Sequence, residues 1–371
     1  MLTAIQNAQI FNGTTIIPNS TLLIRDQYIQ DIIPASSVPS DATLVDAKGM
    51  LLSPGFIDLQ IYGGGGYLFS NDPSTVALQA ISDALVQQGT TTYMLTLATN
   101  ENDIYLRAFE AAKSNPHPAL AGLHLEGPFF NPIKRGAHIE RLIHPPQLQE
   151  VNALLQAAGG TLKMMTLAPE VCSDEVLAVL QKNNVILSAG HSNATYNEAM
   201  QGFSKGIRTV THLFNAMSAF HHRDTGLPGA AFLSNAYARI IADGIHADWQ
   251  TLRISKQMMG RRLFLITDAV QENLSGAYVH IRKGDRYTLP DGTLSGSSIT
   301  MSDAVRNCVR HAGIELAEAL RMATLYPAEV MQEPTLGRIA PGTKANLVLL
   351  DEDINVKQVW HSGKAVAVPG S

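Results

Sequence analysis

The chain has 371 residues, of which 45% are hydrophobic and 16% charged, and its formal net charge is −5. A mildly acidic chain without a run of lysine and arginine lacks the electrostatic footprint of a protein that binds nucleic acid or an anionic membrane. We therefore expect an enzyme-sized globular protein that binds neither of these partners.

Hydropathy and cysteine content indicate a cytoplasmic protein. The chain opens without a charged segment followed by an apolar one, and no stretch reaches the ~20 apolar residues that span a membrane. Its two cysteines, Cys172 and Cys308, are too few for a disulfide framework, which fits a reducing compartment. Both are expected to be small buried hydrophobic residues.

The two ends of the chain share one pattern. Residues 1–50 alternate apolar and polar side chains in short pieces, which are separated by turn signals such as Asn12–Gly13. Residues 337–371 do the same. Two sets of strands this small cannot form cores alone, so we expect them to pair in one small β-sandwich domain.

Residues 51–336 contain eight short apolar runs, which are separated by segments with helical periodicity. The runs are 56–62, 91–97, 120–126, 162–168, 185–189, 208–214, 238–242 and 263–267. Eight such β–α units predict the α/β class and a closed (β/α)8 barrel of the TIM type. An open doubly wound sheet would carry a glycine-rich phosphate turn after its first strand, and the four glycines at 63–66 lack that fingerprint.

Two more helices are expected between the barrel and the C-terminal strands. Residues 301–312 and 314–324 carry helical periodicity, and Ser302 is a plausible N-cap for the first of them. These helices complete the barrel domain, which we expect to run from residue 51 to residue 336.

Polar side chains close several of the apolar runs, at the strand ends where barrels of this type gather catalytic residues. Glu126 closes the third run, His191 follows the fifth, His212 lies at the end of the sixth and Asp268 follows the eighth. One carboxylate and two imidazoles suit a catalytic divalent metal ion that keeps an open position for water. Asp268 is then the candidate general base.

Each of these residues also has a structural interpretation. A histidine after a strand is more often a hydrogen-bonded core or loop residue, and Asp268 alone could be a helix N-cap. The coincidence of four such residues at strand ends favours a metal site. His124 shares the strand parity of Glu126, and we expect it in an interior layer of the barrel instead of among the ligands.

The predicted site suits hydrolysis of an amide or a related bond. A metal ion with three protein ligands lowers the pKa of bound water towards ~7 and supplies hydroxide at neutral pH. This hydroxide would attack a carbonyl carbon. Asp268 would take the proton as general base and later deliver it, as general acid, to the leaving nitrogen.

Several motifs occur in order through the barrel and carry a family resemblance. They are PGFID at 54–58, HLEGP at 124–128, GHS at 190–192, THLFNAM at 211–217, TDA at 267–269 and LSGS at 294–297. Together they resemble the N-acetylglucosamine-6-phosphate deacetylases of the amidohydrolase superfamily, hydrolases that act on a linear amide. The resemblance implies a homodimeric enzyme of amino-sugar catabolism that converts N-acetylglucosamine 6-phosphate to glucosamine 6-phosphate and acetate.

The resemblance also implies roles for individual residues. The metal ligands fall on Glu126, His191 and His212, and the catalytic acid and base falls on Asp268. The substrate contacts fall on Ala137, His138, Asn215, Ala216, Arg223, Asp243, Gly244, Ile245, His246, Leu294, Ser295, Gly296 and Ser297. For a phosphorylated sugar, the guanidinium of Arg223 offers a planar fork, and the backbone N–H groups of Asn215 and Ala216 add neutral donors. Whether Arg223 serves its own site or that of a neighbouring subunit stays open.

The first strand departs from a pattern that many amidohydrolases share. They place His-x-His at its end, whereas this chain has Gln60 and Tyr62, and no lysine closes the fourth strand. We therefore expect one divalent ion per chain, with Gln60 near the metal but not among its first-choice ligands. Imidazole and carboxylate ligands accept both zinc and ferrous iron. Zinc is the first expectation and ferrous iron the second.

Two other functions stay open. The same site could deacetylate N-acetylgalactosamine 6-phosphate or another N-acyl amino sugar, because the sequence does not separate C4 epimers. A barrel that has lost activity and serves as a binding subunit would show a broken ligand set or lack Asp268, and all four residues are present.

Overall fold

The computed structural model describes residues 1–34 and 37–368 of the chain, which divides into two compact units. The first unit consists of Met1–Asp58, Asp83–Thr92 and Thr300–Ser371, and the second of Leu59–Ser82 and Tyr93–Ile299. The domain boundaries that the sequence predicts, 1–50 with 337–371 and 51–336, stay a prediction.

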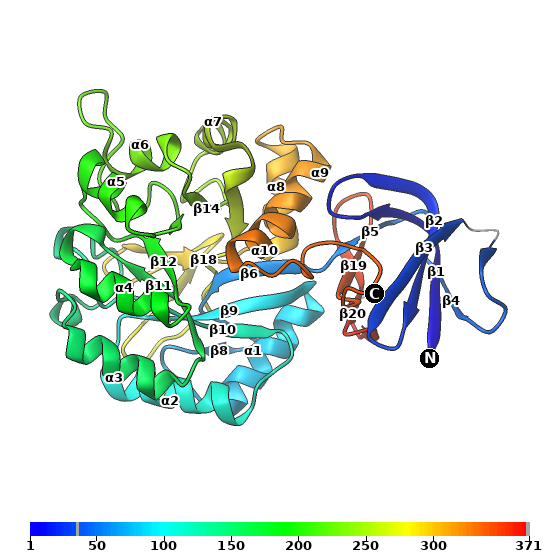
Figure 1. The fold of residues 1–371 in the computed structure, drawn as a ribbon, viewed down its shortest axis with the longest axis horizontal. Coiled ribbons are helices and arrows are strands. Elements are labelled where there is room, and N and C mark those ends of the chain that lie inside the picture. Colours follow the sequence, from blue (N-terminus) through cyan, green and yellow to red (C-terminus); the bar gives the residue numbers. More distant parts are fainter. Residues whose placement is uncertain (35–36, 369–371) are drawn as a thin grey trace. The chain divides into compact units, whose positions relative to one another are not determined.

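Most of an eight-stranded parallel sheet lies in the second unit (Figure 1). Its order along the sheet is β6 (Phe56–Ile61), β9 (Thr90–Ala98), β10 (Leu120–Glu126), β11 (Leu162–Leu167), β12 (Ile186–Ala189), β13 (Thr209–Val210), β14 (Tyr237–Ile241) and β15 (Leu263–Ile266). Each strand lies within or overlaps one of the eight predicted runs. Every residue of β6 and β9 is buried, as expected for strands covered on both faces.

Backbone hydrogen bonds link the last strand to the first. The N–H of Asp268 donates to the carbonyl of Gln60 at 2.9 Å, and the N–H of Tyr62 donates to the carbonyl of Ala269 at 2.9 Å. These bonds close the ring at the C-terminal ends of β15 and β6. The structure therefore confirms the predicted α/β class and the TIM-type barrel, with a separate β-sheet domain.

Helices follow the strands in the order that a β–α repeat requires. They are α1 (Thr75–Gln87), α2 (Asn102–Ser114), α3 (Leu148–Ala158), α4 (Asp174–Lys182), α5 (Tyr196–Ser204), α6 (Gly226–Leu233) and α7 (Trp249–Met259). Helix α4 shows why such a segment is helical. The hydroxyl of Ser173 accepts from the N–H of Val176, Asp174 and Glu175 occupy the positive end of the helix, and Lys182 lies in its last turn.

The two ends of the chain form one sheet in the first unit, in the order β21–β20–β19–β5–β1–β2–β3 with β4 beside β1. The strands are β1 (Leu2–Phe11), β2 (Ile16–Arg25), β3 (Tyr28–Pro34), β4 (Thr43–Asp46), β5 (Leu51–Pro54), β19 (Leu347–Leu350), β20 (Val356–His361) and β21 (Lys364–Val366). Strands β5 and β19 pair antiparallel, and Ile5 and Leu52 share a core with Leu347 and Trp360. The predicted pairing of the two chain ends is confirmed.

Short strand pairs extend the loops of the second unit. Strands β7 (Gly63–Gly64) and β8 (Tyr67–Leu68) form a two-stranded sheet, and β16 (Ile281–Lys283), β17 (Arg286–Thr288) and β18 (Leu294–Ser297) form another sheet. A Cβ atom on Gly63 would lie 2.3 Å from the carbonyl oxygen of Tyr67. Part of the glycine run at 63–66 is therefore explained by the close approach of two backbones.

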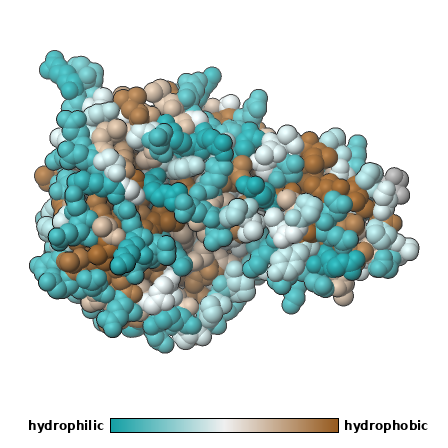
Figure 2. Space-filling model, viewed as in Figure 1, coloured by the Kyte–Doolittle hydropathy of each residue, from teal (hydrophilic) through white to brown (hydrophobic). Residues whose placement is uncertain are grey.

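Two details of side-chain placement concern the cysteines and the surface. Cys308 is fully buried, as expected, whereas Cys172 is only partly buried, and the described residues contain no disulfide bond. The face drawn in Figure 2 is mostly hydrophilic, with smaller hydrophobic areas between. Among the residues that the structure describes, no helix has the length and apolar character needed to cross a membrane.

Helices α8 (Met301–Arg310), α9 (Leu316–Ala323) and α10 (Leu325–Met331) belong to the first unit. The N-cap of α8 is Thr300 and not Ser302, which lies inside the first turn. The hydroxyl of Thr300 accepts from the N–H of Asp303 at 3.2 Å, and the carboxylate of Asp303 accepts from the N–H of Thr300 at 2.9 Å. This reciprocal pair is a capping box, which the expected cap at Ser302 could not form with the residue three positions later, Val305.

We expect Thr300→Ala to lower the free energy of unfolding by about 0.5–2 kcal/mol, because the substitution leaves an N–H of the first turn without its acceptor. Urea unfolding of the two proteins measures the difference. Ser302→Ala is the matched control and should cost less, since within the described residues the hydroxyl of Ser302 bonds only with the hydroxyl of Thr300, at 3.0 Å. A larger loss in Ser302→Ala would contradict the assignment of the cap.

Candidate active site

The predicted metal ligands and the predicted general base lie together at one end of the barrel. Glu126 is the last residue of β10, and His191, His212 and Asp268 each come two residues after the end of β12, β13 and β15. Their exposed fractions are 2%, 4%, 6% and 7% in that order. Four largely buried side chains at the ends of four strands therefore lie close together.

Three of these residues leave their strands with left-handed backbone. The φ angles of His191, His212 and Asp268 are 48°, 26° and 55°. Residues other than glycine rarely adopt this region, and each sparsely populated conformation costs on the order of 1–3 kcal/mol. Backbone hydrogen bonds hold the carbonyl groups of all three. The N–H of Asn131 donates to His191 at 3.0 Å, that of Asn215 to His212 at 2.9 Å and that of Ser297 to Asp268 at 3.0 Å.

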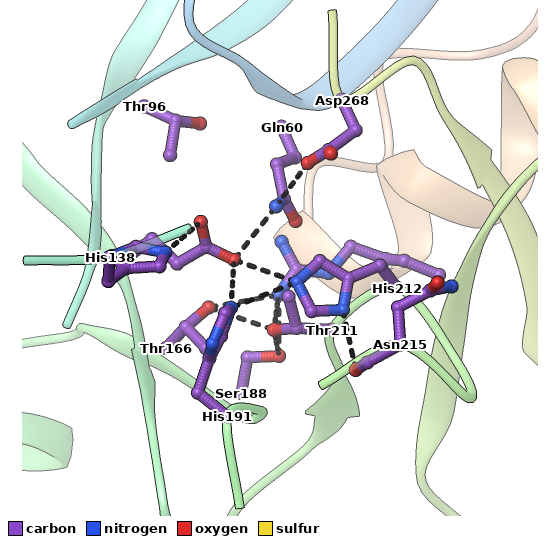
Figure 3. A network of polar contacts seen from close by, with 12 residues as sticks. Gln60, Thr96, His138, Thr166, Ser188, His191, Thr211, His212, Asn215 and Asp268 are labelled. Carbon is purple, nitrogen blue, oxygen red and sulfur yellow. Dashed lines mark hydrogen bonds and ion pairs between the residues drawn. The ribbon is translucent and has the colours of Figure 1, made fainter. Parts of the chain in front are cut away.

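Glu126, His191 and His212 form a group whose ligand atoms all lie within 4.8 Å of one another. Oε1 of Glu126 lies 3.4 Å from Nε2 of His191 and 3.1 Å from Nε2 of His212. The two Nε2 atoms are 3.1 Å apart, and Figure 3 shows both rings turned toward this point. A buried group of two imidazoles and one carboxylate could hold a metal ion.

The hydrogen bonds of the two histidines test whether a cation fits between them. Nδ1 of His191 lies 2.9 Å from the carbonyl of Lys134, and Nδ1 of His212 lies 3.1 Å from the carbonyl of Asn215. A carbonyl oxygen only accepts, so both Nδ1 atoms carry the proton and both Nε2 atoms present lone pairs. Burial lowers the pKa of His212, which disfavours an added proton. The donor set therefore fits a divalent cation.

Gln60 joins the two carboxylates of the site. Its Nε2 lies 2.6 Å from Oδ1 of Asp268 (Figure 3). The same atom lies 3.0 Å from Oε1 of Glu126, and the side chain of Gln60 is fully buried. An amide that donates to both groups reduces their mutual repulsion and fixes the direction of Asp268. Gln60 thus lies beside the candidate metal position without belonging to the group of three, as the sequence predicts.

The environment of Glu126 keeps its carboxyl group ionised. Burial by itself raises the pKa of a carboxyl group, but hydrogen bonding, led by the bond from His138, outweighs this effect and holds the pKa of Glu126 well below its ordinary value. Nδ1 of His138 accepts from the N–H of Thr99 at 3.2 Å, so its Nε2 carries the proton and faces Oε2 of Glu126 at 3.3 Å. Burial lowers the pKa of His138 to about 4, so the ring is neutral at pH 7.

A pocket with about 760 Å³ of empty space, part of it open to solvent, is lined by the four residues Glu126, His191, His212 and Asp268. The predicted substrate contacts that line it are Ala137, His138, Asn215, Ala216, His246, Leu294, Ser295 and Gly296. Asp243 supports one of them, because its carboxylate accepts from Nδ1 of His246 at 2.6 Å and from the backbone N–H groups of Ile245 and His246 at 2.9 Å each. Asp243 therefore orients His246 toward the pocket.

Other predicted contacts lie elsewhere. Arg223 is exposed and is not among the residues that line the pocket in the described part of the chain, nor are Gly244 and Ile245. The hydroxyl of Ser297 donates to the carbonyl of Thr267 at 2.5 Å, so Ser297 supports the backbone at Asp268. The expected backbone donor at Asn215 is already engaged, because its N–H donates to the carbonyl of His212 at 2.9 Å.

A polar layer fills the barrel below this pocket. His124 is fully buried there, with Nδ1 at 3.2 Å from the hydroxyl of Thr96 and Nε2 at 2.8 Å from that of Thr166. The guanidinium of Arg239 is also fully buried and donates to the hydroxyl of Ser188 at 2.5 Å. Burial, followed by the charge of Arg239, holds the pKa of His124 well below its ordinary value. His124 therefore lies in an interior layer of the barrel, as its strand parity predicts.

Sequence reasoning assigned no role to several pocket residues. Tyr62, Tyr278 and His280 all line the pocket, and Nδ1 of His280 lies 2.9 Å from the hydroxyl of Ser295. Strand parity with Gln60 could have revealed Tyr62. Tyr278 and His280 come from the long segment between β15 and β18, and no periodic pattern connects that segment to the barrel.

Comparison with known proteins identifies the family. Residues 51–366 match the model of the Amidohydrolase family. The N-acetylglucosamine-6-phosphate deacetylase of Haemophilus influenzae is 32% identical over 97% of this chain and 98% of its own length. The N-acetylgalactosamine-6-phosphate deacetylase of Escherichia coli O157:H7 is 31% identical over 91% of this chain and 93% of its own length.

Solved structures give a similar result. The N-acetylglucosamine-6-phosphate deacetylase of Pasteurella multocida superposes with a TM-score of 0.95 at 33% identity, over 99% of this chain and 100% of that one. A second structure is an aspartate-to-alanine mutant of the N-acetyl-D-glucosamine-6-phosphate deacetylase of Mycobacterium smegmatis in complex with N-acetyl-D-glucosamine 6-phosphate. It gives a TM-score of 0.90 at 28% identity, over 99% of this chain and 100% of that one.

Proposed function

Because the chain belongs to the amidohydrolase family, we propose that it hydrolyses the acetamide of N-acetylglucosamine 6-phosphate to glucosamine 6-phosphate and acetate. The observation that carries the proposal is the convergence of Glu126, His191 and His212 beside Asp268 in one pocket. The names of relatives that match nearly the whole chain support the choice of substrate.

The metal part of the proposal concerns one divalent ion per chain. Glu126, His191 and His212 would hold it, and both zinc and ferrous iron suit two imidazoles and a carboxylate. When bound, such an ion polarises the amide carbonyl and lowers the pKa of water. Gln60 would lie beside the ion without binding it, because its amide N–H groups point to the two carboxylates.

The side chains of this chain would move the proton and hold the developing charge. Asp268, fixed by Gln60, takes a proton from the attacking water as the new C–O bond forms. It then delivers that proton to the nitrogen as the C–N bond breaks, so that acetate and a free amine leave. The neutral Nε2–H of His138 is a suitable donor for the oxygen that gains negative charge.

The phosphate would lie on the side of the pocket formed by Asn215, Ala216 and His246. Leu294, Ser295 and Gly296 of β18 would contact the sugar. Because Arg223 is exposed and lies off the pocket of its own chain in the described residues, we place it at the pocket of the neighbouring subunit in a homodimer. The lack of a disulfide bond among the described residues is consistent with the cytoplasm as the location.

N-acetylgalactosamine 6-phosphate is the second candidate substrate, because at least two relatives carry that name, at 31% and 35% identity. The glucosamine epimer is favoured because both structural relatives described above are named for it. An inactive binding subunit is disfavoured by the complete set of Glu126, His191, His212 and Asp268.

Acetate release tests the proposal most directly. The purified protein should release acetate from N-acetylglucosamine 6-phosphate faster than from the galactosamine epimer, and only poorly from unphosphorylated N-acetylglucosamine. A preference for the galactosamine epimer would change the proposed substrate but not the proposed reaction. No acetate from any of the three compounds, with metal bound, would overturn the proposed reaction.

We expect the purified protein to carry about one divalent ion per chain, and His191→Asn to lose it, because the ion then lacks one of three ligands. Asparagine tolerates left-handed backbone, so the variant should fold. Elemental analysis after dialysis measures the content, with His144→Asn, a partly exposed histidine outside the site, as control. Two tightly held ions that are both needed for turnover would contradict the expectation.

We expect Asp268→Asn to lower kcat roughly 10²-fold or more, because the amide cannot carry the proton from water to the leaving amine. Metal content and substrate affinity should stay close to those of the unmodified protein, since Asn can still accept from Gln60. Steady-state kinetics with elemental analysis measure both. A kcat within a few-fold of that of the unmodified protein would show that another group transfers the proton, and His138 would be the first candidate.

We expect Arg223→Met to lower kcat/KM for the 6-phosphate by about 10- to 200-fold, because a charge-assisted hydrogen bond to phosphate is worth about 1.5–3 kcal/mol. The already poor turnover of unphosphorylated N-acetylglucosamine should change little. Equal losses for both substrates would show that Arg223 supports the structure or the chemistry and does not read the phosphate.

A further inference from the structure

Tyr62 is a pocket residue to which the proposed reaction assigns no role. It directly follows β6, and its backbone is held on both sides, since its N–H donates to Ala269 at 2.9 Å and its carbonyl accepts from Phe69 at 3.0 Å. The side chain is 7% exposed. Its ring belongs to an apolar cluster that also contains Leu68, Ala98, Val270, Tyr278 and Tyr287. The ring therefore has little freedom to turn, and its hydroxyl occupies a defined place.

That hydroxyl hydrogen-bonds with Oε2 of Glu126. The two oxygens of this carboxylate have different surroundings. Oε1 faces the Nε2 atoms of His191 and His212 and accepts from Gln60, whereas Oε2 faces Tyr62 and His138. Oε1 thus points to the candidate metal position, while Oε2 is held by Tyr62 and His138 on the other side of the carboxylate. A carboxylate free to rotate could exchange the two oxygens or present both.

Neither of the other two donors can select the oxygen that faces the metal position. Gln60 donates to Oε1, the same oxygen that faces the histidines, so its bond does not hold Oε2 away. His138 faces Oε2 at 3.3 Å, but it also lines the pocket, where its N–H is the suitable donor to a substrate oxygen. If His138 donates to a substrate oxygen instead, Tyr62 remains as a donor that holds Oε2.

We propose that Tyr62 is a positioning residue for the metal centre, whose hydroxyl fixes Glu126 so that Oε1 alone faces His191 and His212. The hydroxyl acts through Glu126 and takes no part in bond making. Partners of this kind, which orient a ligand, typically contribute 10- to 100-fold in metal affinity. The inference rests on the proposed metal site but does not depend on which N-acyl sugar the enzyme takes.

The test compares two tyrosines of the same apolar cluster. Tyr62→Phe removes only the hydroxyl that contacts Glu126 and leaves the ring in place. Tyr278→Phe removes a hydroxyl that donates to the backbone carbonyl of Thr99 at 2.5 Å and contacts no candidate ligand. The affinity of the metal-free, full-length proteins for Zn²⁺ alone is measured by competition with a chelator, and metal-free melting temperatures report on folding.

We expect Tyr62→Phe to bind Zn²⁺ about 10- to 100-fold more weakly than the unmodified protein, and Tyr278→Phe to bind it with unchanged affinity. Unchanged affinity in Tyr62→Phe, or equal losses in both variants, would overturn the role of Tyr62 while leaving the proposed hydrolysis in place. Failure of the unmodified protein to bind Zn²⁺ or Fe²⁺ would instead overturn the metal site on which both proposals rest.

Discussion

The arrangement of this site depends on one buried negative charge. Glu126 is 2% exposed, and a carboxylate without water is strongly unfavourable unless hydrogen-bond donors or a cation surround it. Gln60 and Tyr62, at the end of the first barrel strand, donate hydrogen bonds to it, and so does His138 in the loop after β10. His191 and His212 present lone pairs beside it, which a cation would bind. Closure of the barrel is what brings these separate segments to one carboxylate.

Much of the barrel could be predicted because its signals are local. Eight apolar runs with a β–α spacing correspond to the eight parallel strands, and the rule that catalytic residues lie at the C-terminal ends of strands selected Glu126, His191, His212 and Asp268. The rule works because parallel strands all end on the same side of the sheet. Neither step requires knowledge of contacts between distant segments.

The remainder depends on contacts that no local pattern contains. Thr300 and Ser302 are both good N-cap residues, and the choice between them follows from Asp303 being three positions after Thr300. Tyr278 reaches the pocket because Asn71, more than two hundred positions earlier, holds its segment through a bond of 2.8 Å to its carbonyl. The exposed position of Arg223 and the engaged N–H of Asn215 likewise follow from the folded backbone.

The left-handed backbone at His191, His212 and Asp268 has a consequence for laboratory evolution of this protein. Glycine, and to a smaller degree asparagine, would relieve the conformational cost at each of these positions. A library selected only for heat resistance should therefore accumulate these residues at the three strand ends and lose turnover as it gains stability. Thermal selection of this barrel needs an activity check in every round, because mutations that relax the backbone at these three strand ends also dismantle the pocket.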